Sequence, residues 1–130
     1  MDIEMELTRI IIQETAEQQI IVLKERFGER AFPIVIGNVE AYAIDRRLKG
    51  YQAPRPLTHD LVHNVISQMG GSLERIVIND LRDHTFYARL IIRQEDQLIE
   101  VDSRPSDAIA LGVVNNTQIF CAEHVLNEVC

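Results

Sequence analysis

The 130-residue sequence has few cysteines, no tryptophan and no long apolar run, and each absence removes a class of protein. Two cysteines, Cys121 and Cys130, do not make a secreted disulfide framework, so we interpret both as thiols. No apolar run approaches the roughly 20 residues that span a bilayer. The first eight residues contain three acids and no basic residue, unlike a signal peptide. We therefore expect a cytoplasmic protein that does not bind membranes.

Signatures of the common cofactor enzymes are also absent. The chain contains no GxGxxG, GxxxxGK[ST], HExxH or CxxC motif, so no organic cofactor is expected. Basic residues are scarce, with 13 Lys and Arg against 20 Asp and Glu, for a net charge of −7. Such a charge repels polyanions and argues against a broad basic surface for nucleic acid. A bound divalent cation or a few local arginines would still allow contact with phosphates.

The remaining composition is typical of one folded domain over residues 1–130, with 46% hydrophobic and 25% charged residues. Apolar and β-branched patterns predict strands over residues 7–13, 19–24, 31–36, 72–81, 85–93, 98–101 and 118–121. Helical spacing predicts helices over residues 38–49, 58–69 and 105–114, and a short one from Ala122. We therefore expect an α+β fold, with a mixed, largely antiparallel sheet packed against three to four helices.

The segment VDSRPSDAIAL, residues 101–111, places several polar residues at the start of a helix that we expect to be buried. Backbone N–H groups and the positive end of the helix dipole meet there. As a functional site, the segment would bind phosphate through three side chains and a metal ion through two, which could also activate water. The candidate phosphate-binding side chains are those of Arg104, Ser103 and Ser106. The candidate metal ligands are Asp102 and Asp107. Helix capping, with Ser103 as the N-cap, explains the same residues without any function.

A second polar group lies in PRPLTHD, residues 54–60, where a proline-rich loop leads into a helix. Arg55 and His59 are candidates for phosphate binding and acid–base chemistry. Asp60 follows His59 directly, so the two side chains diverge around the helix axis and should not bind the same ion. Capping of the helix by Thr58 is the structural alternative.

Glu40 is an acid inside the otherwise apolar run GNVEAYAI. A half-buried carboxylate needs a partner, and Arg55 and Arg104 are the candidates. An internal salt bridge and a contribution to the metal site remain alternatives.

A third polar group, in the segment NDLRDHTFYARL, contains Asp80, Arg82, Asp83 and His84. We interpret it as a solvated turn between strands. His124 and His63 are interpreted as surface residues of helices.

Four segments in the order GNVEAYAIDRRLKG, PRPLTHDLVHNVI, DHTFYARL and IEVDSRPSDAIALGV resemble the bifunctional nuclease domain family. The resemblance spans residues 7–125, and SRPSDAIAL is its most specific segment. It implies an α+β fold, a homodimer and hydrolysis of phosphodiester bonds in RNA and DNA, an activity described mainly for plant members. No catalytic residue carries over with the resemblance.

Site roles therefore follow from chemistry at the motif positions. Hydrolysis of a phosphodiester needs a water nucleophile, stabilisation of negative charge and a proton for the leaving oxygen. We expect Asp102 and Asp107, with Glu40, to bind Mg²⁺ or Mn²⁺, and His59 to act as general acid or base. Arg104 and Arg55 would clamp the phosphate.

The alternative is a non-catalytic dimeric module that binds or regulates a partner. The acidic composition and the absence of tryptophan favour it, because single-stranded nucleic acids are commonly stacked on aromatic side chains. Phe86 and Tyr87 lie within a strand pattern and are interpreted as core or interface residues. A small-molecule hydrolase is a third alternative.

Overall fold

Seven strands form one curved sheet in the order β3-β2-β1-β7-β4-β5-β6. The computed structural model describes the backbone of residues 1–130 and every side chain except that of Val114. The strands are β1 (Asp2–Ile11), β2 (Gln18–Glu25), β3 (Ala31–Gly37), β4 (Gly71–Arg82), β5 (Thr85–Gln94), β6 (Gln97–Ser103) and β7 (Gln118–Ala122). Only the β4–β7 pair is parallel, so the predicted mixed, largely antiparallel sheet is confirmed.

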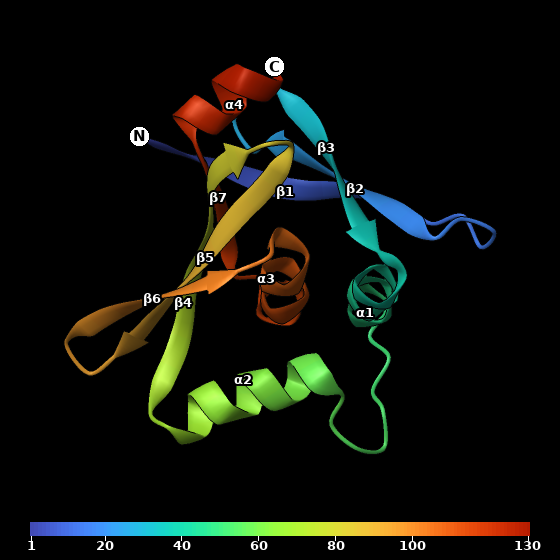
Figure 1. Cartoon of the computed structure of the whole chain (residues 1–130). Coiled ribbons are helices and arrows are strands. Elements are labelled where there is room, and N and C mark those ends of the chain that lie inside the picture. The colour runs from blue at the N-terminus through green and yellow to red at the C-terminus, as the bar shows by residue number, and fades with distance from the viewer.

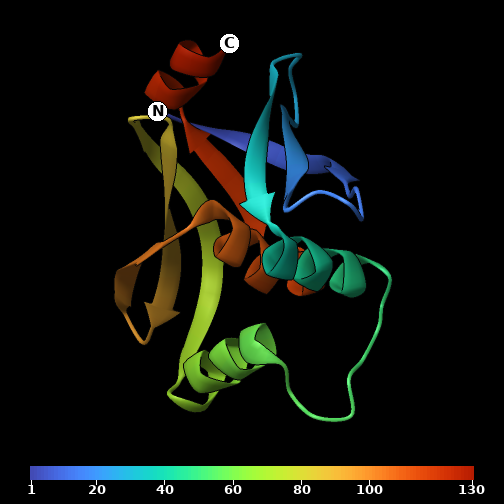
Figure 2. The same ribbon diagram turned by 45° about the vertical axis from the view of Figure 1, so that its right-hand side comes forward.

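Four α-helices complete the predicted α+β fold: α1 (Asn38–Leu48), α2 (Thr58–Gln68), α3 (Pro105–Gly112) and α4 (Glu123–Val129). A short 3₁₀ turn, η1 (Val113–Asn115), follows α3. Figures 1 and 2 show α4 beside the two chain ends, whereas α1, α2 and α3 lie away from them, around one end of the sheet. None of the helices that the structure describes combines the length and apolarity needed to cross a bilayer.

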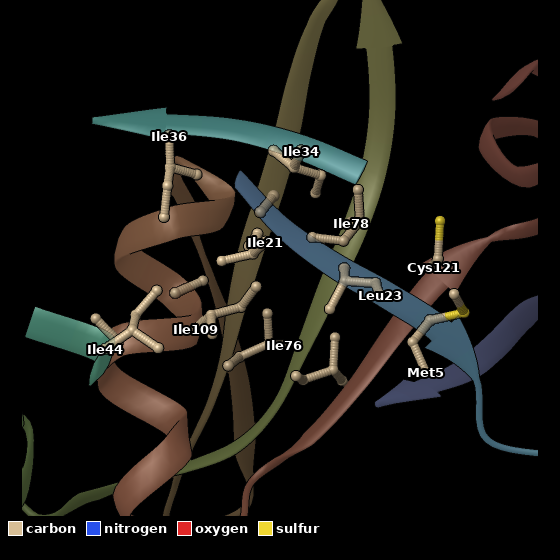
Figure 3. Packing of buried hydrophobic residues seen from close by; sticks show 14 of the residues in the cluster. Met5, Ile21, Leu23, Ile34, Ile36, Ile44, Ile76, Ile78, Ile109 and Cys121 are labelled. Carbon is tan, nitrogen blue, oxygen red and sulfur yellow. The ribbon is translucent and has the colours of Figure 1, made fainter. Parts of the chain in front are cut away.

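The first three strands form a meander whose alternate side chains enter the core. Ile21, Leu23, Ile34 and Ile36 lie on the same side as Ile76, Ile78 and Ile109, as Figure 3 shows. Pro33 is tolerated because β3 is an edge strand. β1 begins at Asp2, earlier than predicted, because it also pairs with β7, a strand more than a hundred residues away.

Helix α3 is the buried helix that its sequence predicted. Asp107 is half-buried, and the other seven of its eight residues are buried: Pro105, Ser106, Ala108, Ile109, Ala110, Leu111 and Gly112. A Cβ atom added at Gly112 would lie 2.6 Å from Cδ1 of Ile76, so glycine allows the close approach of α3 to β4. The end of α3 therefore packs closely against β4.

Helix α2 is packed differently, because most of its apolar side chains face solvent. Leu61, Val65 and Met69 are exposed by 57%, 47% and 69%. Ile66 packs against the core, and His59 is the one residue of α2 classed as buried. The apolar side of α2 is therefore left uncovered within the chain.

Candidate functional site

The three helices α1, α2 and α3 meet around a cavity of about 570 Å³, which we call the His59 cavity. His59 lies in the first turn of α2 and Asp107 in the first turn of α3. The two side chains meet, with His59 Nε2 2.9 Å from Asp107 Oδ1. Two residues from separate predicted motifs, 48 positions apart, therefore converge.

The contact determines the tautomer of the neutral His59 ring. A carboxylate only accepts hydrogen bonds, so Nε2 carries the hydrogen and donates it to Asp107. Nδ1 is then the nitrogen with the free lone pair. The ring is buried, with 9% of the residue exposed, so Asp107 holds its orientation in a partly desolvated place.

Arg104 connects Asp107 to Glu40. Its Nε donates to Asp107 Oδ2 at 2.9 Å, and its Nη2 lies 2.5 Å from Glu40 Oε1. Glu40 is 12% exposed and therefore has the internal salt-bridge partner that its burial requires. The hydrogen bonds to Glu40 and Asp107 raise the pKa of Arg104, so the guanidinium stays charged. Glu40, Arg104, Asp107 and His59 thus form one continuous chain of contacts.

Of the two serines of the motif, Ser103 borders the His59 cavity and Ser106 does not. The prediction that Ser103 caps α3 is wrong, because Arg104 is the N-cap residue and no side chain caps the helix. Ser103 Oγ instead donates to the Arg104 carbonyl oxygen at 2.8 Å. Ser106 is buried, with 5% exposure.

Helix α2 also begins differently from the prediction. Thr58 is its first residue, and Leu57 is the N-cap. The Asp60 carboxylate accepts a hydrogen bond from the Leu57 backbone N–H at 2.9 Å, which satisfies one of the free donors at the helix start. As predicted, Asp60 diverges from His59: it pairs with Arg47.

Asp102 is not brought into the cluster. It pairs with Arg89 in the β5–β6 ladder, whereas its neighbours Val101 and Ser103 pair with buried Leu90 and Ala88. Because side chains alternate along a strand, Asp102 borders the His59 cavity but its carboxylate lies on the face of Arg89. Asp102 and Asp107 thus border the same cavity without meeting in one cluster, and a joint role for the two carboxylates stays a prediction.

Arg55 is also separate from the cluster. It is exposed in the loop between α1 and α2, and it is not among the residues that border the His59 cavity. The loop places His59 beside the start of α3, as the expected mechanism requires, but it leaves Arg55 outside the His59 cavity.

Two arginines of α1, Arg46 and Arg47, border the cavity and were missed by the sequence analysis. Arg47 pairs through Nη2 with Asp60, and its side chain is only 8% exposed. Each has a buried Nε with no acceptor among the side chains and backbone that the structure describes. A signal was available, because Glu40 and Arg47 are seven positions apart and so share one face of the helix.

The carboxylates proposed as metal ligands do not form a joint site in this arrangement. Arg104 contacts both Glu40 and Asp107, and Asp102 belongs to the other face. Among the described residues, no three His, Cys, Asp or Glu side chains are placed to hold one ion. The residues as arranged do not fit the three-ligand Mg²⁺ or Mn²⁺ site that was expected.

The local charge differs from that of the whole chain. Among the charged side chains that border the cavity, Arg46, Arg47 and Arg104 balance Glu40, Asp102 and Asp107, so three positive and three negative charges sum to zero with His59 neutral. The chain as a whole has a charge of −7. The His59 cavity is thus a place where an anion meets no net repulsion from its nearest charges.

Comparisons with known proteins agree with the motif resemblance. The family model for the bifunctional nuclease domain matches residues 21–130. An uncharacterized protein of Mycobacterium tuberculosis, found in two strains, is 40% identical over 125 residues, covering 96% of this chain and 74% of that protein. Bifunctional nuclease 1 of Oryza sativa is 26% identical over 105 residues, covering 78% of this chain and 32% of the rice protein.

Proposed function

The chain belongs to the bifunctional nuclease domain family, and from this premise we propose that the His59 cavity hydrolyses phosphodiester bonds of RNA or DNA. The observation that carries the proposal is the His59–Asp107 contact at 2.9 Å, with Arg104 on the other oxygen of the same carboxylate. The rice relatives are named bifunctional nucleases, which supports the choice of reaction.

In the proposed reaction, His59 acts first as a general base. Its Nδ1 accepts a proton from water, and the water oxygen attacks phosphorus. Asp107 stabilises the imidazolium that forms, through the hydrogen bond at Nε2. The imidazolium then returns the Nδ1 proton to the leaving oxygen as the P–O bond breaks. Transfer by a positioned histidine contributes about 10²- to 10⁴-fold to such rates.

Arginines provide the second component of the proposal. Negative charge develops on the non-bridging phosphate oxygens as water attacks, and fixed N–H donors stabilise it. Arg46 is the strongest candidate for this role, because it borders the cavity with a buried Nε that has no acceptor in the described chain. Arg104 is exposed by 63% and would contact the phosphate from the solvent side.

A cleavage assay tests the proposal. Purified protein is incubated with single- and double-stranded RNA and DNA, in Mg²⁺, in Mn²⁺ and in chelator, beside the double variant His59→Ala, Asp107→Asn. We expect the variant to lose cleavage while retaining its circular dichroism spectrum. The matched control is His124→Ala, Asp80→Asn, which removes a similar contact outside the cavity. Equal degradation by wild type and cavity variant would reject the site.

The metal arms of the assay test the predicted Mg²⁺ or Mn²⁺ requirement separately. Activity that is lost in chelator and restored by either ion would support metal assistance. The activity of Asp102→Asn would then show whether Asp102 takes part in it. Full activity in chelator would reject the metal requirement and leave the histidine mechanism in place.

A non-catalytic dimeric module is the second candidate, and the exposed side of α2 favours it. Leu61, Val65 and Met69 present uncovered apolar side chains there. On the edge strand β6, Ile99 and Val101, which share one face of the strand, are exposed by 37% and 40%. An exposed apolar surface of this kind is typical of an interaction site.

Light scattering during size-exclusion chromatography tests the homodimer. We expect wild type to elute at twice the chain mass and Val65→Lys to elute as a monomer. A monomeric wild type would reject the dimer. Cleavage by the wild type, with or without metal, that is lost in the His59→Ala, Asp107→Asn variant would reject the non-catalytic module. The cytoplasmic location stays a prediction, which cell fractionation tests.

A further inference from the structure

A second cavity of about 490 Å³ lies beside the His59 cavity, and we call it the loop cavity. The two cavities share four bordering residues: Arg46, Arg47, Leu57 and Leu111. The other walls of the loop cavity come from the loop between α1 and α2 and from the solvent side of α2. A ligand that occupies the His59 cavity therefore has a neighbouring place for a second chemical group.

The shared wall needs a hydrogen-bond acceptor from a ligand. Arg47 has a side chain that is 92% buried, since 8% is exposed, and its Nε has no acceptor in the described part of the protein. The Nε of Arg46 is in the same condition. A ligand oxygen at the shared wall would interact with the positive charge of these two guanidinium groups. Phosphate oxygens suit arginine best among common acceptors.

The remaining walls suit a flat ring with polar edges. Tyr51 borders the loop cavity and is 57% exposed, so a face of its ring is accessible. The amides of Gln52, Asn64 and Asn115 also border it, and each amide offers donors and an acceptor. Nucleobase edges present donors and acceptors side by side, and their faces stack on tyrosine.

Two prolines make the loop wall rigid. Pro54 and Pro56 border the cavity, and each ring limits rotation about its own φ angle. A loop that is already shaped loses little conformational entropy when a ligand binds. The walls are therefore suited to selecting a ligand by shape.

Resting on the proposed nuclease activity, we propose that the loop cavity binds an unstacked nucleobase of a single-stranded substrate, next to the phosphate in the His59 cavity. Tyr51 stacks on the base, and the amides contact its edge. Arg46 and Arg47 lie between base and scissile bond and contact the phosphate. A base inside a duplex has its face stacked and its edge paired, so single strands are preferred.

Binding is tested in the His59→Ala background, so that the probe is not cleaved. The probes are a fluorescently labelled decamer of deoxyadenosine and an abasic decamer with the same number of phosphates. We expect the abasic probe to bind about tenfold or more weakly, since each stacked base contributes strongly to affinity. Tyr51→Ala should weaken the adenosine probe by about tenfold and leave the abasic probe unchanged.

Two variants serve as controls. Tyr51→Phe retains the stacking ring and should bind like the parent. Tyr42→Ala removes another exposed tyrosine of the same region, on α1, that borders neither cavity. It should also bind like the parent. Thermal unfolding of each variant checks that the fold is retained.

The outcomes separate this inference from the proposed activity. Equal affinity for the two probes, binding of neither probe, or equal weakening of both by Tyr51→Ala would overturn the base site. Base discrimination that depends on Tyr51, in a protein whose wild type cleaves nothing, would support the base site and reject the nuclease proposal. Cleavage by the wild type together with equal affinity for the two probes would support the nuclease proposal and reject the base site.

Discussion

Two groups of histidine, aspartate and arginine occur in this chain, and they differ in surroundings rather than in composition. His59, Asp107 and Arg104 meet at the His59 cavity. The other group consists of Asp80 and Arg82 on β4 and His124 on α4. In both, an arginine and a histidine approach opposite oxygens of one carboxylate.

The histidines show the difference most clearly. The His59 side chain is 11% exposed and lies 2.9 Å from Asp107, whereas the His124 side chain is 63% exposed and lies 3.4 Å from Asp80. Water around His124 weakens its interaction with the carboxylate and leaves the ring free to turn. Burial between two helix starts, rather than the set of residue types, makes the His59 group a candidate site.

The largest expected effect comes from removing each histidine in turn. His59→Ala should lower the rate of phosphodiester cleavage by about 10²- to 10⁴-fold, because the proton acceptor is lost. His124→Ala should leave the rate nearly unchanged. Initial rates on a fluorescent single-stranded oligonucleotide measure both, and similar losses in the two variants would remove the distinction between the groups.

The arginines provide a smaller effect. Arg104→Gln should lower cleavage by on the order of 10²-fold, because a charged donor near the phosphate is lost and Asp107 loses a partner. Arg82→Gln should not change it, since Arg82 contacts Asp80 and lies over the Tyr87 ring, outside the cavity. The values of kcat and KM are measured separately for each variant. If Arg82→Gln changed them as much as Arg104→Gln does, the distinction between the two groups would be contradicted.

Variants of Asp102 test whether the strand face on which a side chain lies decides its role in cleavage. Asp102→Asn should change cleavage in the absence of metal by less than about twofold, because its carboxylate lies on the Arg89 face. Asp107→Asn, in contrast, should reduce it strongly by disturbing the His59 tautomer. Comparable losses in the two variants would place Asp102 in the catalytic group.

The smallest effect concerns stability at the exposed group. The hydrogen bond from Arg82 lowers the pKa of Asp80, so its ionised form is favoured in the folded state. The resulting stability is present above the ordinary aspartate pKa of about 3.9 and is lost as the pH falls through the lowered value. Asp80→Asn should therefore lower Tm slightly at neutral pH and not in strong acid. Asp96→Asn, in an exposed turn, is the control for a lost surface charge.

Much of the fold was predictable because its signals are local. Alternating isoleucines and valines identified the strands, and Gly50 and Gly70, with positive φ, follow the ends of α1 and α2. The position of β7 between β1 and β4 was not predictable, since a strand of five residues contains no information about which distant strands it joins.

The candidate site was predicted in part, for a comparable reason. The motifs identified His59, Arg104, Asp107 and Glu40, and all four are in contact. Asp102 was included because it is close in sequence, but the alternation of a strand sends neighbouring side chains to opposite faces. Arg46 and Arg47 were overlooked because charged residues in a surface helix usually contact water.

The kinds of elements, the rigid proline loop and the motif of the bifunctional nuclease domain family could be found from the sequence, because each depends on residues that are near in the chain. The contact of His59 with Asp107, and the place of Asp102 on the Arg89 face, became visible in the folded chain alone. Those contacts depend on how α2 and α3 pack over the sheet, and packing joins residues through shape and burial rather than through their spacing in sequence.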